Sequence, residues 1–277
     1  MRVLDYLQHL RQGYRLSPNA LDAYMKNLGS YIRGFRYAEK WEVASSPAGH
    51  LEPENSPNRL REYFENNQSG PGIWKWEHYF EVYERHFARF RQQAVNILEI
   101  GVYSGGSLGM WRDYFGPGSH IFGVDIEPAC RVYEREGITV LTGDQRDRGF
   151  WKTFRDRVPR LDVLIDDGGH KPSMQMVTLE EMLPHLSPGG VYLCEDIHGI
   201  HNEFIAFASG LVNELNRVAS PDGVPGGLQR QIHSVHLYPY LLVIEKRDRP
   251  LARLHAPKHG TEWQPFYAAK ASTDEAT

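Results

Sequence analysis

The 277-residue sequence predicts an α/β protein with a seven-stranded, mostly parallel sheet that carries helices on both faces. Two observations support this fold class. From residue 96 onward, short apolar runs alternate with amphipathic segments, which is typical of parallel strands joined by helices. The last two apolar runs are separated only by a tight corner at Tyr238-Pro239-Tyr240, which predicts an antiparallel pair at one edge of the sheet.

Seven apolar runs have the length of strands, and helical patterns lie between the early ones. The predicted strands cover residues 95–102, 120–126, 137–144, 161–167, 190–196, 234–240 and 241–246. The predicted helices between them cover residues 107–115, 128–136, 148–158 and 174–186. In the last of these, Met176, Leu179, Leu183 and Leu186 line one face, which indicates packing against the sheet.

A further helix is predicted over residues 74–90. Trp76, Phe80, Tyr83 and Phe87 recur there at helical spacing and form one aromatic stripe. Stripes of this kind usually pack in a protein core, so we interpret this one as a core face rather than as a ligand-stacking surface.

Residues 1–72 are predicted to form a helical N-terminal extension that ends in a flap-like loop. Ser17-Pro18 is typical of a helix start, and apolar residues follow at helical spacing between Leu21 and Ile32. Residues 44–72 are rich in Ser, Pro, Asn and Gly, and we expect this long connection to cover the functional site. The α/β domain is predicted over residues 73–249 and a C-terminal tail over 250–277.

The composition excludes several classes of protein. With 31 basic and 35 acidic side chains the net charge is −4, which gives no general attraction to nucleic acid or to an anionic membrane. No apolar run approaches the ~20 residues that a membrane span needs. Only two cysteines occur, and Cys194 lies in an apolar run, so no disulfide framework is expected. These features predict a soluble, cytoplasmic protein.

A glycine-rich loop follows the first strand of the α/β region. Small residues at the carboxyl end of such a strand let a ligand approach the backbone closely, but a glycine-rich turn in this place can also serve packing alone. The spacing differs from the G-x-G-x-x-G of dinucleotide-binding proteins, and no Lys-Ser/Thr pair follows as in a phosphate-binding P-loop. The loop is therefore a candidate cofactor site that does not cradle phosphate, and its candidate residues are Glu99, Gly101, Tyr103, Ser104, Gly105 and Ser107.

The next two strand ends carry further candidate cofactor residues. Asp125 comes about 20 residues after the loop, where a carboxylate is placed to accept hydrogen bonds from ribose hydroxyls. A helix-capping role for Asp125 is compatible with this one. Asp144 and Gln145 end the third strand, where either could contact the amine of an adenine, although Asp144 equally suits a turn.

Acidic side chains end the fourth and fifth strands, as Asp166-Asp167 and Glu195-Asp196. Neighbouring strands lie about 5 Å apart, so we expect these carboxylates to converge beside the glycine-rich loop. Such an all-oxygen site suits Mg²⁺, with Mn²⁺ or Ca²⁺ as alternatives, and argues against Zn²⁺. The competing interpretation is that these acids are helix caps and solvated loop residues.

His170 follows Asp167 by three residues, so its ring can reach the same cavity. A neutral imidazole close to a cation suits a general base. His198, two residues after Asp196, is the second candidate for that role.

Taken together, the motifs ILEIGVYSGGSLGMWRDYFGPG, GVDIEP, GDQ, IDDGGH, LSPGGVYLCED and SVHLYPYLLVIEKR resemble a known family. They are similar to the metal-dependent class I S-adenosylmethionine O-methyltransferases of the macrocin/mycinamicin sugar O-methyltransferase and cephalosporin hydroxylase-like superfamily. The resemblance covers residues 74–247 and implies a Rossmann-like fold. It also implies S-adenosylmethionine and Mg²⁺ as cofactors, Asp167, Glu195 and Asp196 as metal ligands, and His170 as the base. Asp166 is assigned with the loop residues to the cofactor.

The resemblance implies O-methylation of a sugar hydroxyl on a small glycosylated natural product, in antibiotic biosynthesis, by a homo-oligomer. One departure concerns the acceptor. Many relatives continue after Glu-Asp with a Thr-Ser-Tyr-like run, whereas this chain has Ile197-His198-Gly199-Ile200-His201. The alternatives are a cephalosporin hydroxylase-like enzyme, methylation of a non-sugar hydroxyl, a nicotinamide-dependent oxidoreductase, and a catalytically silent cofactor-binding protein.

Overall fold

The computed structural model describes residues 18–40, 58–218 and 220–260 of the chain. The chain divides into two units, Met1–Ser56 and Pro57–Thr277. The described part of the first unit consists mainly of helix α2 (Pro18–Ala38), which begins at the proline that the sequence indicates. Everything described below lies in the second unit.

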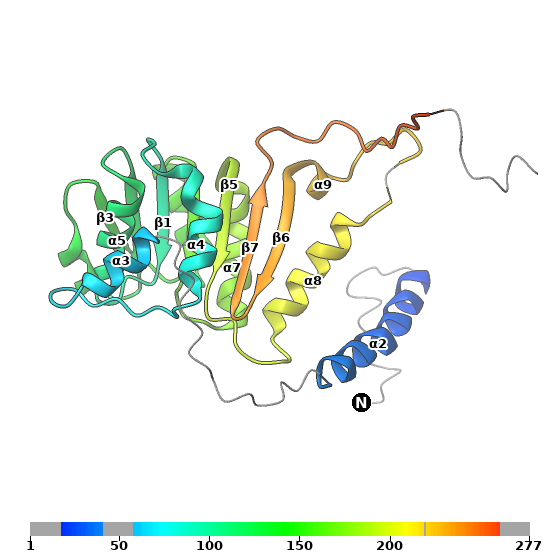
Figure 1. Cartoon of the computed structure of the whole chain (residues 1–277), viewed down its shortest axis with the longest axis horizontal. Coiled ribbons are helices and arrows are strands. Elements are labelled where there is room, and N and C mark those ends of the chain that lie inside the picture. The colour runs from blue at the N-terminus through cyan, green and yellow to red at the C-terminus, as the bar shows by residue number, and fades with distance from the viewer. Residues whose placement is uncertain (1–17, 41–57, 219, 261–277) are drawn as a thin grey trace, which may run out of the picture. The chain divides into compact units, whose positions relative to one another are not determined.

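The second unit is built on one seven-stranded sheet with the order β3-β2-β1-β4-β5-β7-β6 (Figure 1). Its strands are β1 (Asn96–Ile100), β2 (His120–Asp125), β3 (Ile138–Thr142), β4 (Leu161–Asp166), β5 (Leu186–Cys194), β6 (Ile232–Tyr238) and β7 (Leu241–Lys246). The first five strands are parallel, whereas β7 runs antiparallel to both β5 and β6. The predicted sheet, including the antiparallel pair at its edge, is confirmed.

Alternate residues along the strands feed two hydrophobic cores, one on each face of the sheet. Ile97, Val163 and Leu193 point into one core, while Leu98, Leu164 and Cys194 point into the other. Helices α3 (Arg59–Asn66), α4 (Tyr79–Phe87) and α5 (Gly106–Phe115) contribute to the first core. Helices α6 (Arg148–Arg157), α7 (Pro172–Met182) and α8 (Glu203–Leu215) contribute to the second, so both faces are covered (Figure 1).

Short helices complete the connections. They are the 3-10 turns Ala88–Phe90, Pro128–Tyr133 and Leu183–His185, and helix α9 (Gly227–Gln231). Helical structure over 128–136 thus takes the form of a 3-10 turn, and α8 is an element that the sequence analysis does not predict. Within the described residues, no helix combines the length and the apolarity that a membrane crossing requires.

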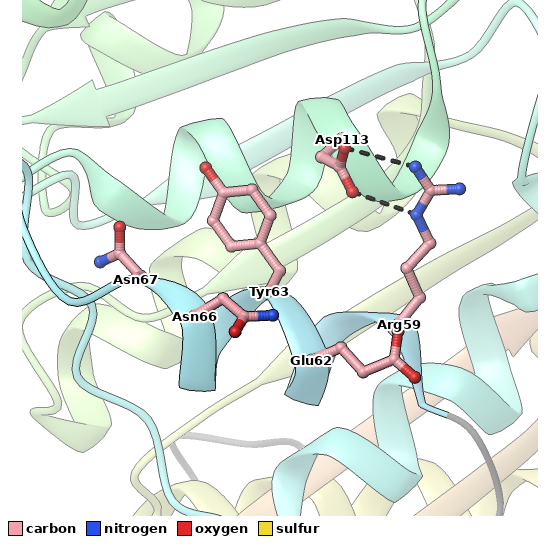
Figure 2. Close-up of a pocket in the computed structure, with 6 residues that line it drawn as sticks. All are labelled: Arg59, Glu62, Tyr63, Asn66, Asn67 and Asp113. Atoms are coloured by element: carbon pink, nitrogen blue, oxygen red, sulfur yellow. Dashed lines mark hydrogen bonds and ion pairs between the residues drawn. The ribbon is translucent and has the colours of Figure 1, made fainter.

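The predicted flap is wrong over residues 59–66, which form α3. The side chain of Asn58 caps this helix by accepting a hydrogen bond from the backbone N–H of Arg61. Leu60 is fully buried, and Arg59 forms a two-bonded ion pair with Asp113 on α5, 3.1 and 3.3 Å long (Figure 2). Residues 44–57 of the predicted flap lie outside the described residues, and the first of the two compact units ends at Ser56.

The predicted aromatic stripe is confirmed for three of its four members. Phe80, Tyr83 and Phe87 are fully buried on α4. Trp76 precedes the helix and is 49% exposed, so its assignment to the core is wrong. Both cysteines are buried free thiols, in agreement with the expected absence of a disulfide.

A buried histidine links α4 to the edge of the sheet and predicts a pH dependence of stability. His86 shares hydrogen bonds with Glu245 (2.7 Å) and Tyr238 (2.9 Å). Burial lowers the pKa of His86 below its ordinary value of 6.5, although the hydrogen bond to Glu245 opposes this. Because the folded state takes up this proton less readily than the unfolded chain, the stabilisation is present above pH 6.5 and is lost as the pH falls through the lowered value.

We therefore expect the thermal unfolding midpoint to fall between about pH 7 and pH 5, and to fall less in His86→Gln. The matched control is His255→Gln, which changes an exposed imidazole. If the unfolding midpoint fell equally with pH in wild type and in His86→Gln, the pH dependence would not be due to His86.

Candidate active site

A cavity of about 670 Å³ lies at the carboxyl ends of the parallel strands. This volume is within the range of pockets that bind small organic ligands. Most of the residues singled out from the sequence line it: Gly101, Tyr103, Ser104, Ser107, Asp125, Asp144, Gln145, Asp167, His170, Glu195, Asp196 and His198. Glu99, Gly105 and Asp166 are not among the lining residues and lie behind them.

The glycines of the loop are explained by packing of the protein itself. Gly101 has a φ of +90°, and a Cβ there would overlap the backbone carbonyl of Asp167. Gly105 has a φ of +72°, and a Cβ there would overlap the ring of Tyr133. Both positions therefore require glycine for the fold of the loop, in addition to any ligand that approaches it.

Asp125 organises the loop through its backbone. One carboxylate oxygen accepts hydrogen bonds from the N–H groups of Val102 (2.8 Å) and Tyr103 (3.0 Å). The other accepts from the N–H of Glu127 at 2.9 Å. The helix-capping role weighed for Asp125 is wrong, because Glu127 is the N-cap of the turn Pro128–Tyr133. The Asp125 carboxylate instead holds the loop and lines the cavity.

Gln145 and Asp166 form a polar network below the cavity. The Gln145 amide donates to Asp166 (2.6 Å) and to Thr178 (2.9 Å), and its oxygen accepts from the N–H of Gly169 (3.0 Å). Burial raises the pKa of Asp166 to about 6. Asp144 lies at the rim, paired with Arg146 at 2.6 Å. The structure therefore gives Gln145 and Asp166 a positioning role beside the predicted cofactor role.

Glu99 is fully buried beneath the loop. Ser107 and Trp111 donate hydrogen bonds to its two carboxylate oxygens, at 2.7 and 3.0 Å. Burial raises the pKa of Glu99. Glu99 thus connects β1 to the first two turns of α5.

The centre of the acidic cluster holds a lysine that the sequence analysis does not single out. The ammonium of Lys75 lies 2.5 Å from Asp167, 3.0 Å from Glu195 and 3.6 Å from Glu99. Its side chain is only 2% exposed. Asp167 and Glu195 directly follow β4 and β5, and Glu99 is the second-to-last residue of the adjacent strand β1. One cation therefore lies among the acids of three neighbouring strands.

Burial and charge act in opposite directions on this cluster. Burial alone would lower the pKa of Lys75, but Asp167, Glu195 and Glu99 together hold that pKa well above its ordinary range. Burial and the nearby charge of Asp167 raise the pKa of Glu195 to about 8, against the effect of Lys75. Lys75 is therefore charged, and it favours the ionised form of the acids around it.

Two tyrosines on one face of α4 hold the acids that follow β5. The Tyr83 hydroxyl donates to Glu195 at 2.7 Å, and the Tyr79 hydroxyl donates to Asp196 at 2.8 Å. Burial raises the pKa of both tyrosines, so they act as hydrogen-bond donors. The aromatic face of α4 is thus a core element that also orients the acidic cluster.

Three of the predicted site residues face the cavity with a metal-binding arrangement. A carboxylate oxygen of Asp167, one of Asp196, and a ring nitrogen of His170 all lie within 4.8 Å of one another. The Nε2 of His170 is 4.0 Å from Asp167 and 3.8 Å from Asp196. His198 approaches Asp196 from another side, at 3.9 Å. This donor set fits a hard divalent cation.

Strained backbone gathers around the cavity. Among the described residues, the non-glycine positions with positive φ are Gln92, Tyr103, His170, Asp196 and Tyr240. Tyr103, His170 and Asp196 line the cavity, and Tyr240 packs beside it. Residues in this conformation usually persist where the surrounding structure fixes them for function.

Sequence reasoning misses Lys75, Trp76, Tyr79 and the hydroxyl of Tyr83. The available signal was a single lysine between two tryptophans in an otherwise aromatic stretch, Trp74-Lys75-Trp76. A buried lysine needs carboxylate partners, but its partners are 24 or more residues away along the chain.

Another hollow, of about 420 Å³, lies between α3 and α5. Among its charged residues, Arg59 and Asp113 pair with each other, and Glu62 is the third (Figure 2). It therefore offers none of the converging acids of the main cavity.

Comparisons with known proteins agree with this geometry. Residues 98–197 match a family model described as a methyltransferase domain. A relative from Streptomyces olivaceus, 8-demethyl-8-alpha-L-rhamnosyl tetracenomycin-C 2'-O-methyltransferase, is 33% identical over 200 residues, which are 64% of this chain and 52% of the relative. Demethylmacrocin O-methyltransferase of Streptomyces fradiae is 32% identical over 240 residues, covering 78% of this chain and 59% of that protein.

A solved structure supports the same relationship. The MycE methyltransferase of the mycinamycin biosynthetic pathway, in complex with Mg and SAH, matches with a TM-score of 0.59 and 27% identity over 80% of this chain and 61% of that chain. The chain spans about half the length of the tetracenomycin relatives that it matches. The chain thus carries a Rossmann-like methyltransferase domain of the kind found in the sugar O-methyltransferases of macrolide and tetracenomycin pathways.

Proposed function

We propose that this protein transfers a methyl group from S-adenosylmethionine to a sugar hydroxyl of a glycosylated natural product, with Mg²⁺ as the metal. The observation that carries the proposal is one continuous cavity that joins the glycine-rich loop and Asp125 to the open cluster of Asp167, Asp196 and His170. The Streptomyces olivaceus relative is named for methylation of a rhamnosyl tetracenomycin, and one MycE complex contains Mg, SAH and mycinamycin VI.

Each part of the cavity has a distinct role in this proposal. The bound cofactors supply an activated methyl group and a positive charge that stabilises an ionised hydroxyl. In this proposal the glycine-rich loop, held by Asp125, would bind the methyl donor, and Asp167 and Asp196 would hold the metal. Glu195, the third acid that the resemblance implies as a ligand, has its two oxygens hydrogen-bonded by Lys75 and Tyr83 and would support the site from behind. Tyr79 orients Asp196 and Tyr83 orients Glu195, while Lys75 pairs with Glu195 and Asp167. His170 accepts the proton that the acceptor hydroxyl loses.

The function is tested by incubating the protein with S-adenosylmethionine, Mg²⁺ and a panel of rhamnosylated polyketides and macrolides. We expect mass spectrometry to show a product that is heavier by one CH₂ unit. Activity should disappear with a chelator and return with Mg²⁺. A chelator-resistant rate would contradict the metal role, and an added oxygen atom instead of CH₂ would favour a hydroxylase-like reaction.

Replacing Asp125 with Ala is expected to weaken S-adenosylmethionine binding by about 1–3 kcal/mol, the usual effect of losing a charge-assisted hydrogen bond. The variant also releases the N–H groups of Val102 and Tyr103, so the loop becomes less ordered. Titration calorimetry measures the effect, with Asp156→Ala on the exposed face of α6 as control. Unchanged affinity in Asp125→Ala would remove Asp125 from the cofactor site.

Homo-oligomer formation and a cytoplasmic location stay predictions of the sequence analysis.

A further inference from the structure

An exposed aromatic group stands at the end of the cavity that bears Asp196. Trp76, His198 and Tyr240 form this group, which we call the aromatic wall. The ring centroids are 5.5 Å apart for Trp76 and Tyr240, 6.4 Å for Trp76 and His198, and 4.5 Å for His198 and Tyr240. Trp76 and Tyr240 are 49% and 41% exposed, a large share for side chains of this size.

The burial of Lys75 determines where Trp76 lies in the wall. Because the Lys75 side chain points into the acidic cluster, its chain neighbours Trp74 and Trp76 point outward, 87% and 49% exposed. The indole N–H of Trp76 then donates to Asp196 at 3.0 Å. This bond uses the single polar group of the indole, so the ring offers an apolar surface to a ligand.

The position of Tyr240 is fixed by its backbone. Its backbone carbonyl accepts a hydrogen bond from the N–H of Ile197 at 3.0 Å, and its φ is +63°. This bond joins the corner between β6 and β7 to the loop that contains Asp196 and His198. Three separate segments of the chain therefore converge to present three rings beside one acid.

The wall lies at the opposite end of the cavity from Asp125. In the sheet order, β2 carries Asp125, β5 leads to Asp196, and β1 and β4 lie between them. Three strand spacings of about 4.8 Å separate the two ends. If the methyl donor occupies the Asp125 end, the wall belongs to the acceptor.

The angles between the rings indicate which part of an acceptor fits. They are tilted or perpendicular, at 50°, 80° and 85°, so the rings form an angular corner instead of a parallel slot. A flat polycyclic aglycone needs parallel faces to bury its two sides. A pyranose chair has C–H groups directed at its faces and edge, and it can place these against an angular apolar corner.

We infer that the aromatic wall is the specificity-determining surface for the sugar of the acceptor, and that it binds a pyranose whose apolar C–H face packs on Trp76 and Tyr240. This inference rests on the proposed function and names the substrate group at that site. The contact places the hydroxyls of the sugar over Asp196, since the Trp76 indole donates a hydrogen bond to the Asp196 carboxylate.

The test compares loss of a ring with loss of its polar atom. Tyr240→Leu and Trp76→Leu remove a ring, whereas Tyr240→Phe and Trp76→Phe keep one. Binding of methyl α-L-rhamnopyranoside to the protein loaded with Mg²⁺ and S-adenosylhomocysteine is followed by saturation-transfer NMR. We expect saturation of the ring C–H protons in wild type, with a dissociation constant raised about tenfold, or ~1.4 kcal/mol, in the leucine variants and less than about threefold in the phenylalanine variants.

Tyr240→Leu is the cleaner variant because the Tyr240 side chain has no bond to Asp196. Its affinities for Mn²⁺ and S-adenosylhomocysteine should equal those of wild type, which separates loss of the wall from loss of folding. Equal rhamnoside affinity in wild type and both leucine variants would overturn the inference, as would absence of any saturation in wild type. If the protein methylates glycosides and Tyr240→Leu leaves the acceptor KM unchanged, the proposed function holds and this inference is overturned. If rhamnoside binding depends on the wall but no methyl transfer occurs, the inference about the wall holds and the proposed function fails.

Discussion

Replacing Lys75 with Met is expected to lower the free energy of unfolding by about 3–5 kcal/mol, the usual cost of removing one partner from a buried ion pair. The cost is high because Lys75 is the cation closest to Asp167 and Glu195 in a site where its own side chain is 2% exposed. Without it, like charges at the ends of β1, β4 and β5 face one another, and the burial of Glu195 is no longer offset. Thermal and denaturant unfolding measure the loss.

The matched control is Lys152→Met, which removes an exposed i,i+4 pair with Asp156. Such surface pairs contribute about 0.3–0.5 kcal/mol, so this variant should unfold almost as wild type does. We also expect Mg²⁺ to raise the unfolding midpoint of Lys75→Met, because a divalent ion that binds the acids stabilises the folded state by mass action. A Lys75→Met protein as stable as Lys152→Met would show that the acids do not need this counter-ion.

The sheet was predictable because its strands are nearly continuous apolar runs and its helices have one apolar face. The meeting of Asp167 with Glu195 followed from the same reasoning, since β4 and β5 are neighbours and their last residues must converge. Helix α3 was not predictable in the same way. It has only Leu60, Tyr63 and Phe64 as apolar residues, and the Pro- and Asn-rich segments beside it have the composition of a loop.

The burial and the hydrogen-bond partners of the site residues could not be predicted from the sequence, for a physical reason. A charged residue has the same chemistry in the sequence whether it lies in solvent or between three carboxylates, so no local pattern marks Lys75 as buried. The aromatic stripe of α4 predicted a core face correctly, but the position of the hydroxyls of Tyr79 and Tyr83 depends on how that helix docks on β5. The sequence left a ligand role and a packing role open for Gly101 and Gly105, and their nearest constraints in the structure are the Asp167 backbone and Tyr133.

Replacing His170 with Ala is expected to lower the rate of methyl transfer by roughly 10²–10⁴, the usual contribution of a general base. His170 is suited to the role by its place at the mouth of the acidic cluster, 3.8 Å from Asp196 and 42% exposed, so its ring can reach a bound hydroxyl. The decrease should become smaller at high pH, where the hydroxyl ionises without help. Single-turnover rates measured across pH test this, with the exposed His255→Ala as control.

The same variant decides between two roles that the geometry permits for His170. As a base, it can be removed while Mn²⁺ affinity, measured by electron paramagnetic resonance, stays within about threefold of wild type, since the charge that attracts the ion resides on the carboxylates. As a metal ligand beside Asp167 and Asp196, its removal would lower that affinity together with the rate. A His170→Ala protein that keeps the full rate at neutral pH would exclude both roles. The role of the base would then pass to His198, which lies 3.9 Å from Asp196. The expected combination of a slow reaction with intact metal binding therefore identifies His170 as the group that accepts the proton.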